Sequence, residues 1–229
     1  MNEPRIPRGG RVADAIRDAG LVIVLRRVEP RQRLLDLVDG LAESGGRIFE
    51  ITLDGEDAPA DLAAAREQLA DRGGDTCFVG AGTVRTIEQL AAAIDAGAAF
   101  GVSPVLDPPI LAAAIEAGLP FVPGAYTPTE ADTAWRAGAT FVKLFPGSSL
   151  GASHVRELRG PLPEIETIVT GGVDATNAIS FLEAGATAVG IGSAIVRATA
   201  DERRTLIAAI TTAVASARRD AGATPRRPQ

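Results

Sequence analysis

A single lysine stands inside an apolar run, in the stretch ATFVKLFPG at positions 139–147. Of the 23 lysine and arginine residues in the chain, Lys143 is the only lysine. Strand alternation places Phe141, Lys143 and Phe145 on one face. Burial favours the neutral amine, which attacks a carbonyl, whereas an arginine stays protonated. Two interpretations are open: a nucleophile that forms an imine, or a lysine that reaches the rim or pairs with a carboxylate.

A carboxylate occupies a similar position in RIFEITLD, residues 47–54. Glu50 lies in the middle of this predicted strand, where a carboxylate requires a buried partner. Lys143 is the obvious candidate, and Glu50 would then be a general acid and base. The alternative is a structural ion pair, with Lys143, Arg26 or Arg47.

Two glycine-rich turns follow later strands, in VTGGVD and GIGSAIV. Thr170, Gly171 and Gly172 lead into one predicted helix, and Gly192 and Ser193 lead into another. Glycine lets backbone N–H groups approach an anion, and a helix start favours negative charge. These turns therefore predict a phosphate site, with tight turns of no further function as the alternative. The stretch VGAGTV contains no G-x-G-x-x-G, so a dinucleotide site is rejected.

The segments that must position these side chains repeat along the chain. An alanine-rich segment ends in glycine, and a β-branched or aromatic run follows. Six direct copies have their glycines at Gly20, Gly45, Gly97, Gly118, Gly138 and Gly185, and divergent copies at 71–79 and 158–169 make eight. The predicted strands are 21–25, 47–53, 76–80, 99–103, 120–123, 140–145, 166–170 and 187–191.

Eight strand–helix units predict a (β/α)₈ TIM barrel, with function at the carboxyl ends of the strands. An open doubly wound sheet is the alternative. A helix over 11–19 is expected before the first strand. We predict one barrel domain over 1–220 and a disordered tail over 221–229.

Composition narrows the function classes. The net charge is −6 and the pI is near 4.9, which argues against a nucleic-acid partner. One cysteine and one histidine exclude a disulfide framework and a multi-histidine metal site. No apolar run is long enough to span a membrane, and the N-terminus has no signal-peptide core. A soluble, cytoplasmic protein is expected.

With these residues assembled, the chain resembles the 2-keto-3-deoxy-6-phosphogluconate (KDPG) and 4-hydroxy-2-oxoglutarate (KHG) aldolase family. The resemblance covers about residues 11–215. The motifs that carry it are FEITL, VGAGTV, GVSP, PGAYTPTE, FVKLFPG, TGGV and GIGSA. It implies a homotrimeric barrel and a class I aldolase that uses a covalent imine, with no metal and no other cofactor.

The resemblance also implies roles for individual residues. Lys143 is the Schiff-base lysine and Glu50 the acid and base. Thr83 lies by the pyruvate carboxylate, and Gly171, Gly172 and Ser193 lie at the phosphate. The full expected substrate-binding set is Arg26, Thr83, Pro104, Phe145, Thr170, Gly171, Gly172, Gly192 and Ser193.

The implied reaction cleaves KDPG to pyruvate and glyceraldehyde 3-phosphate, as in the Entner–Doudoroff route of carbohydrate metabolism. The same chemistry on 2-keto-3-deoxy-6-phosphogalactonate or on KHG is the nearer alternative. A phosphosugar epimerase or isomerase, or a non-catalytic sugar-phosphate sensor, is more distant.

One position departs from the family pattern. A branch of the family has arginine where this sequence has Asp54, and that arginine holds the substrate carboxylate. Arg26, in IVLRR at the end of the first predicted strand, resembles an arginine found in other branches. We expect Arg26 to replace the missing clamp, with pairing of Arg26 to Glu50 or Asp54, or an inward Arg27, as alternatives. The changes SPV for SPG and VTGG for PTGG leave the substrate open.

Overall fold

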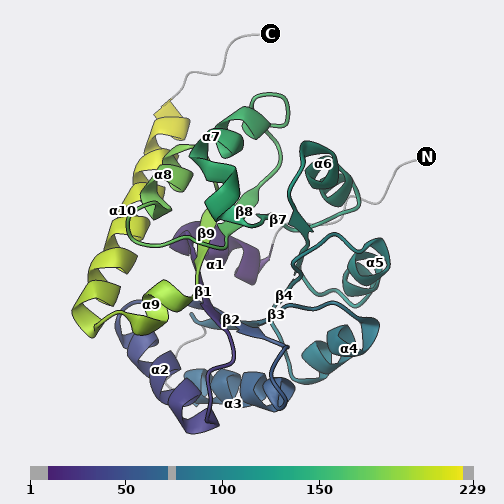
Figure 1. Ribbon diagram of the computed structural model, residues 1–229, viewed down its shortest axis with the longest axis vertical. Helices are drawn as coiled ribbons and strands as arrows, with labels where there is room; N and C mark the ends of the chain where they lie inside the picture. The colour runs from purple at the N-terminus through teal and green to yellow at the C-terminus, as the bar shows by residue number, and fades with distance from the viewer. Residues whose placement is uncertain (1–9, 72–75, 224–229) are drawn as a thin grey trace.

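The repeat folds into a ring of parallel strands surrounded by helices (Figure 1). The computed structural model describes residues 10–71 and 76–223. The strands are β1 (Leu21–Leu25), β2 (Ile48–Thr52), β3 (Phe78–Gly82), β4 (Gly101–Val102), β5 (Phe121–Val122), β6 (Gly124–Ala125), β7 (Val142–Leu144), β8 (Thr167–Thr170) and β9 (Ala188–Ile191).

Helices alternate with the strands and form the outer layer (Figure 1). They are α1 (Arg11–Ala19), α2 (Arg31–Glu43), α3 (Ala58–Asp71), α4 (Ile87–Asp95), α5 (Pro108–Glu116), α6 (Pro128–Arg136), α7 (Gly147–Arg159), α8 (Ala178–Glu183), α9 (Ser193–Arg197) and α10 (Ala200–Ala223). The predicted helix over 11–19 is confirmed.

The ring closes through a strand that is broken in two. The sheet order runs β5-β4-β3-β2-β1-β9-β8-β7-β6. The two end strands, β5 and β6, are consecutive in the sequence and are separated by Pro123 alone. Proline has no N–H for a ladder, which explains the break in the predicted strand 120–123. The Thr140 amide donates to the Phe121 carbonyl and the Lys143 amide to the Pro123 carbonyl, each at 2.9 Å, across this seam. The predicted TIM barrel is therefore confirmed, and the open sheet is excluded.

Most predicted strands lie within a residue or two of those observed. The third begins later than predicted, because its ladder with β2 starts at the Ile48–Phe78 pair. All six glycines of the direct repeats have positive φ, as the helix-ending interpretation requires. Helix α10 continues to Ala223, into the stretch predicted as a tail, and residues 224–229 lie outside the described residues.

Two apolar layers hold the barrel together. The larger packs the outward faces of the strands against the helices. The smaller fills the amino-terminal half of the barrel, where α1 closes the bottom; it comprises Val12, Ala13, Ile16, Val22, Ile48, Phe100, Val102, Val122, Phe141, Ile168 and Ala188. Because apolar side chains fill this end, the polar residues of the interior lie toward the carboxyl ends of the strands.

Within the part of the chain that the structure describes, no helix has the length and apolar character needed to cross a bilayer.

Candidate active site

Lys143 and Glu50 face each other inside the barrel. Phe141 belongs to the interior cluster, whereas Val142 and Leu144 pack outward, so alternation points Lys143 inward as predicted. Glu50 points inward from β2 for the same reason. The Lys143 Nζ and Glu50 Oε1 atoms are 3.9 Å apart, and the side chains are 7% and 2% exposed.

The gap between these two groups leaves room for a mediator. A distance of 3.9 Å is too long for a direct hydrogen bond, and Glu50 Oε1 is buried with no hydrogen-bond partner among the described residues. A water or a substrate oxygen between the amine and the carboxylate would satisfy both. Gly82 on β3 provides the space for Glu50, since a Cβ there would lie 2.6 Å from Glu50 Cγ and overlap Oε1.

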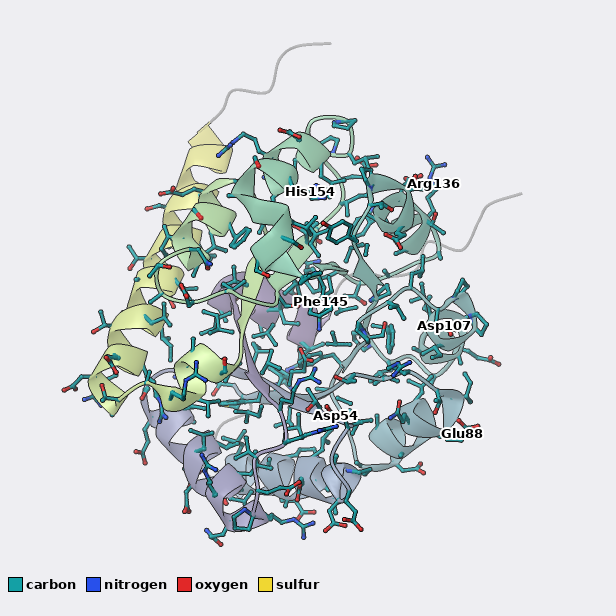
Figure 2. All side chains as sticks on the ribbon, viewed as in Figure 1. Asp54, Glu88, Asp107, Arg136, Phe145 and His154 are labelled. Carbon is teal, nitrogen blue, oxygen red and sulfur yellow. The ribbon has the colours of Figure 1, made fainter. Side chains whose placement is uncertain are left out.

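Phe145 covers the Lys143 amine from the outer side. Its ring centroid lies 5.4 Å from Lys143 Nζ, within the range of a cation–π contact. Figure 2 shows Phe145 near the centre of the barrel. Gly171 packs against the phenyl ring of Phe145, because a Cβ at Gly171 would lie 2.9 Å from two carbons of that phenyl ring.

A cavity of about 440 Å³ extends from Lys143 over the ends of β8, β9 and β1. Its walls are formed by Val24, Arg26, Val28, Lys143, Phe145, Thr170, Gly171, Gly172, Val173, Gly190, Gly192, Ser193, Val196 and Arg197. Three of these residues are basic and none is acidic, although the chain as a whole carries a net charge of −6. Positive charge concentrated in a hollow of an acidic protein favours an anionic ligand.

The turn after β8 is preorganised by its glycines and by side-chain hydrogen bonds. Gly171 and Gly172 have φ values of 85° and 74°, which favour glycine over other residues. The Asn177 side chain accepts from the Asp174 amide and donates to the Gly172 carbonyl, at 3.0 and 2.9 Å. The predicted glycine turns therefore line the same cavity as Lys143, and their role in phosphate binding stays a prediction.

Arg26 joins the site through a short polar network. It donates to Asp54 Oδ2 at 2.8 Å and to Thr83 Oγ1 at 3.1 Å, and Arg27 Nε lies 3.3 Å from the same Asp54 oxygen. Arg26 lines the cavity and Arg27 does not. One alternative is thus observed, because Arg26 pairs with Asp54. A guanidinium has five N–H groups, so Arg26 retains donors for a ligand.

Two residues next to Arg26 have an unusual backbone conformation: its neighbour in sequence, Arg27, and its hydrogen-bond partner, Thr83. Arg27 and Thr83 are the two non-glycine residues with positive φ in the described part of the chain, at 47° and 58°. This conformation is unusual for a β-branched residue, and such strain tends to occur at functional sites. Burial acts to raise the pKa of Asp54, but the Thr52 hydroxyl and the charges of Arg26 and Arg27 outweigh it and lower that pKa. Asp54 is therefore a carboxylate at neutral pH.

Not every predicted residue lines the cavity. Thr83 reaches it only through Arg26, and Glu50 only through Lys143. Pro104 is absent from its walls. Sequence reasoning in turn missed Arg197, which follows Ser193 by four residues on α9. That spacing puts Ser193 and Arg197 on one helix face, and it is the feature of the sequence that could have identified Arg197. Among the described residues, no three His, Cys, Asp or Glu side chains gather as a cation site.

Fold and site together define a (β/α)₈ barrel lyase of the imine-forming, class I aldolase type. More specifically, the chain belongs to the KDPG and KHG aldolase family, whose sequence model matches residues 12–211.

Similar proteins carry related names. A probable 2-dehydro-3-deoxy-6-phosphogalactonate aldolase of Rhizobium meliloti (strain 1021) is 35% identical, over 76% of this chain and 81% of the relative. A 2-dehydro-3-deoxy-phosphogluconate aldolase of Treponema pallidum (strain Nichols) is 34% identical, over 70% of this chain and 73% of the relative. A KDPG aldolase of Legionella pneumophila, solved with pyruvate captured as a covalent carbinolamine, superposes with a TM-score of 0.73 at 25% identity, covering 90% of this chain and 98% of that one.

Proposed function

We propose that this protein is a class I aldolase that cleaves KDPG to pyruvate and glyceraldehyde 3-phosphate, with Lys143 as nucleophile. The observation that carries this proposal is Lys143, which lines a cavity with three basic and no acidic lining residues and faces the buried Glu50 at 3.9 Å. The relative with a covalent pyruvate carbinolamine supports the imine route.

The reaction begins at the lysine. The Lys143 amine attacks the C2 ketone of the 2-keto-3-deoxy acid and forms a carbinolamine. Loss of water gives an iminium, whose positive nitrogen accepts an electron pair. Removal of the C4 hydroxyl proton then breaks the C3–C4 bond, which releases the aldehyde and leaves an enamine on Lys143. Protonation of the enamine at C3 and hydrolysis of the iminium release pyruvate and restore the amine.

Glu50 moves the protons in these steps. Its carboxylate is buried, makes no other ion pair among the described residues and lies 3.9 Å from Lys143 Nζ, so one bridging water links it to the reacting atoms. Through that water Glu50 protonates the departing hydroxide and returns a proton to C3. A general acid and base positioned in this way contributes typically 10²–10⁴-fold to the rate.

The two anionic groups of the substrate bind at different parts of the site. The carboxylate at C1 is held by Arg26 and the Thr83 hydroxyl, which Arg26 already contacts. A bidentate guanidinium suits a carboxylate, and Asp54 orients Arg26 from behind. The phosphate is held by the turn of Gly171 and Gly172 and by Ser193.

The stereochemistry at C4 is the finer part of the proposal. One relative is named for a phosphogalactonate and another for a phosphogluconate, which differ at that carbon. Pyruvate release should be measured with KDPG, its phosphogalactonate epimer and KHG. The proposal requires Lys143-dependent cleavage, with the highest kcat/KM for KDPG. A higher kcat/KM for one of the other two compounds would change the assigned substrate. Failure to cleave any of the three would refute the proposed function.

Two further properties are proposed on the family resemblance alone. We propose a homotrimer and a cytoplasmic location. Sedimentation of the purified protein would test the first, since a monomer at micromolar concentration contradicts it, and fractionation of the source cells would test the second.

A further inference from the structure

We infer that Arg197 is a specificity-determining residue that selects substrates and aldehydes with a terminal phosphate. The inference rests on the proposed aldolase function and adds a residue to it. Arg197 lies at the end of α9 and lines the cavity that contains Lys143.

The charges that line the cavity single out this arginine. Arg26 pairs with Asp54 at 2.8 Å and is assigned to the C1 carboxylate of the substrate, and Lys143 faces Glu50 at 3.9 Å. In the part of the chain that the structure describes, Arg197 has no acidic partner within ion-pair distance. Arg197 is therefore the basic residue of the cavity that remains for a second anionic group of the substrate.

Helix α9 presents Arg197 and Ser193 together. They are four residues apart and thus on one face of the helix, and both are exposed to the cavity. Ile195 on the opposite side is fully buried and anchors the helix to the core. Ser193 and Arg197 thus line the same cavity as the turn of Gly171 and Gly172.

Helix α9 is fixed from behind by α10. Arg203 donates from Nε to the Ile195 carbonyl at 3.1 Å and from Nη2 to the Val196 carbonyl at 2.8 Å. These bonds satisfy carbonyls at the end of α9, which would otherwise lack partners. Because these hydrogen bonds hold the backbone that bears Arg197, ligand binding costs less conformational entropy.

The chemistry of a phosphate ester fits this arrangement. A monoester carries a charge of about −1.5 to −2 at pH 7 and three acceptor oxygens. Backbone N–H groups and a serine hydroxyl supply hydrogen bonds but no full positive charge, which Arg197 adds in a fork geometry suited to phosphate. The second carboxylate of KHG is attached directly to C4, so it lies closer to Lys143 and farther from α9.

The test compares two aldehydes that differ only in the phosphate. Condensation of pyruvate with D-glyceraldehyde 3-phosphate and with D-glyceraldehyde should be measured for the wild type, Arg197→Ala and Arg197→Lys. The ratio of kcat/KM, phosphorylated over unphosphorylated, should fall about tenfold or more in Arg197→Ala, the scale of a lost charge-assisted hydrogen bond. Arg197→Lys should fall in between, because it keeps the charge and loses the fork.

Arg156→Ala is the matched control. Arg156 is exposed on α7 and does not line the cavity. Arg156→Ala makes the same change in net charge as Arg197→Ala and should leave the ratio of kcat/KM values unchanged. Inorganic phosphate, as a competitor of the phosphorylated aldehyde, should inhibit Arg197→Ala more weakly than the wild type. Borohydride trapping of pyruvate on each variant reports whether it is folded.

An unchanged ratio in Arg197→Ala, or the same fall in Arg156→Ala, would overturn the inference while leaving the aldolase function intact. A wild-type protein that neither condenses these aldehydes nor traps pyruvate would instead refute the proposed function.

Discussion

Gly82 allows the sharpest test of how Glu50 is positioned. In Gly82→Ala the new Cβ would lie 2.6 Å from Glu50 Cγ and 2.7 Å from Cδ. Carbon atoms pack at about 3.5–4.0 Å, so the carboxyl group has to move by about 1 Å. Glu50 is buried, and its displacement changes the path to Lys143. A misplacement of about 1 Å can lower the rate on the order of 10²-fold, which is the fall in kcat we predict.

Gly80→Ala is the control for strain alone. Gly80 lies on the same face of β3, and its Cβ would lie 2.5 Å from the Phe100 ring, with no Glu50 atom among its nearest contacts. Overpacking costs about 1–3 kcal/mol in either variant. Thermal unfolding would compare their stability, and pyruvate release coupled to lactate dehydrogenase would give kcat. Should Gly82→Ala lose no more kcat than Gly80→Ala, the placement of Glu50 is not what limits the reaction.

Three further predictions follow from other parts of the site and scaffold. Arg26→Ala should raise the pyruvate concentration for half-maximal borohydride trapping about tenfold, with partial recovery in Arg26→Lys; unchanged trapping would confine Arg26 to its pair with Asp54. Gly172→Ala places a Cβ 2.5 Å from Ser148 Cβ and should raise KM for the phosphorylated substrate above all, whereas equal damage with KHG favours a structural turn. The pKa of Glu130 is lowered by the Tyr126 amide and then by Thr127, so Glu130→Gln should destabilise the fold at pH 7, and urea melts should show the difference shrinking below pH about 4.

The pH dependence expected for Glu130→Gln follows from proton linkage. A carboxyl whose folded pKa lies below its unfolded value contributes stability above the unfolded pKa, and that contribution is lost as pH falls through the folded pKa. Glu130 is exposed, so the effect should be a few tenths of a kcal/mol. A difference that grows in acid would contradict the capping role.

The barrel and its central pair follow from strict local rules. A strand alternates with period two, so the inward direction of Lys143 and Glu50 was determined once their apolar neighbours were assigned to the outer face. Glycines that end helices mark the repeat, because a left-handed residue is needed there. The capping box of Thr127 and Glu130 is a local pattern of the same kind, because its two residues are three positions apart in TPTE.

Other features depend on contacts between distant segments. Three partners were open for Arg26, since a long side chain on a strand end has many rotamers, and the structure brings it to Asp54 and Thr83. Arg197 was missed because α9 is one short helix whose orientation depends on Arg203 of α10. The break at Pro123 shows how one residue without an N–H can divide a strand that apolar content predicts as continuous.

The most direct test of the account is covalent trapping at Lys143. The wild type should be incubated with pyruvate and borohydride, digested and analysed by mass spectrometry. We predict a three-carbon acid on the peptide that contains Lys143, the only lysine in the chain, and the loss of this adduct together with aldol activity in Lys143→Arg. Adduct found solely on the N-terminal amine, or full turnover by Lys143→Arg, would contradict the central claim.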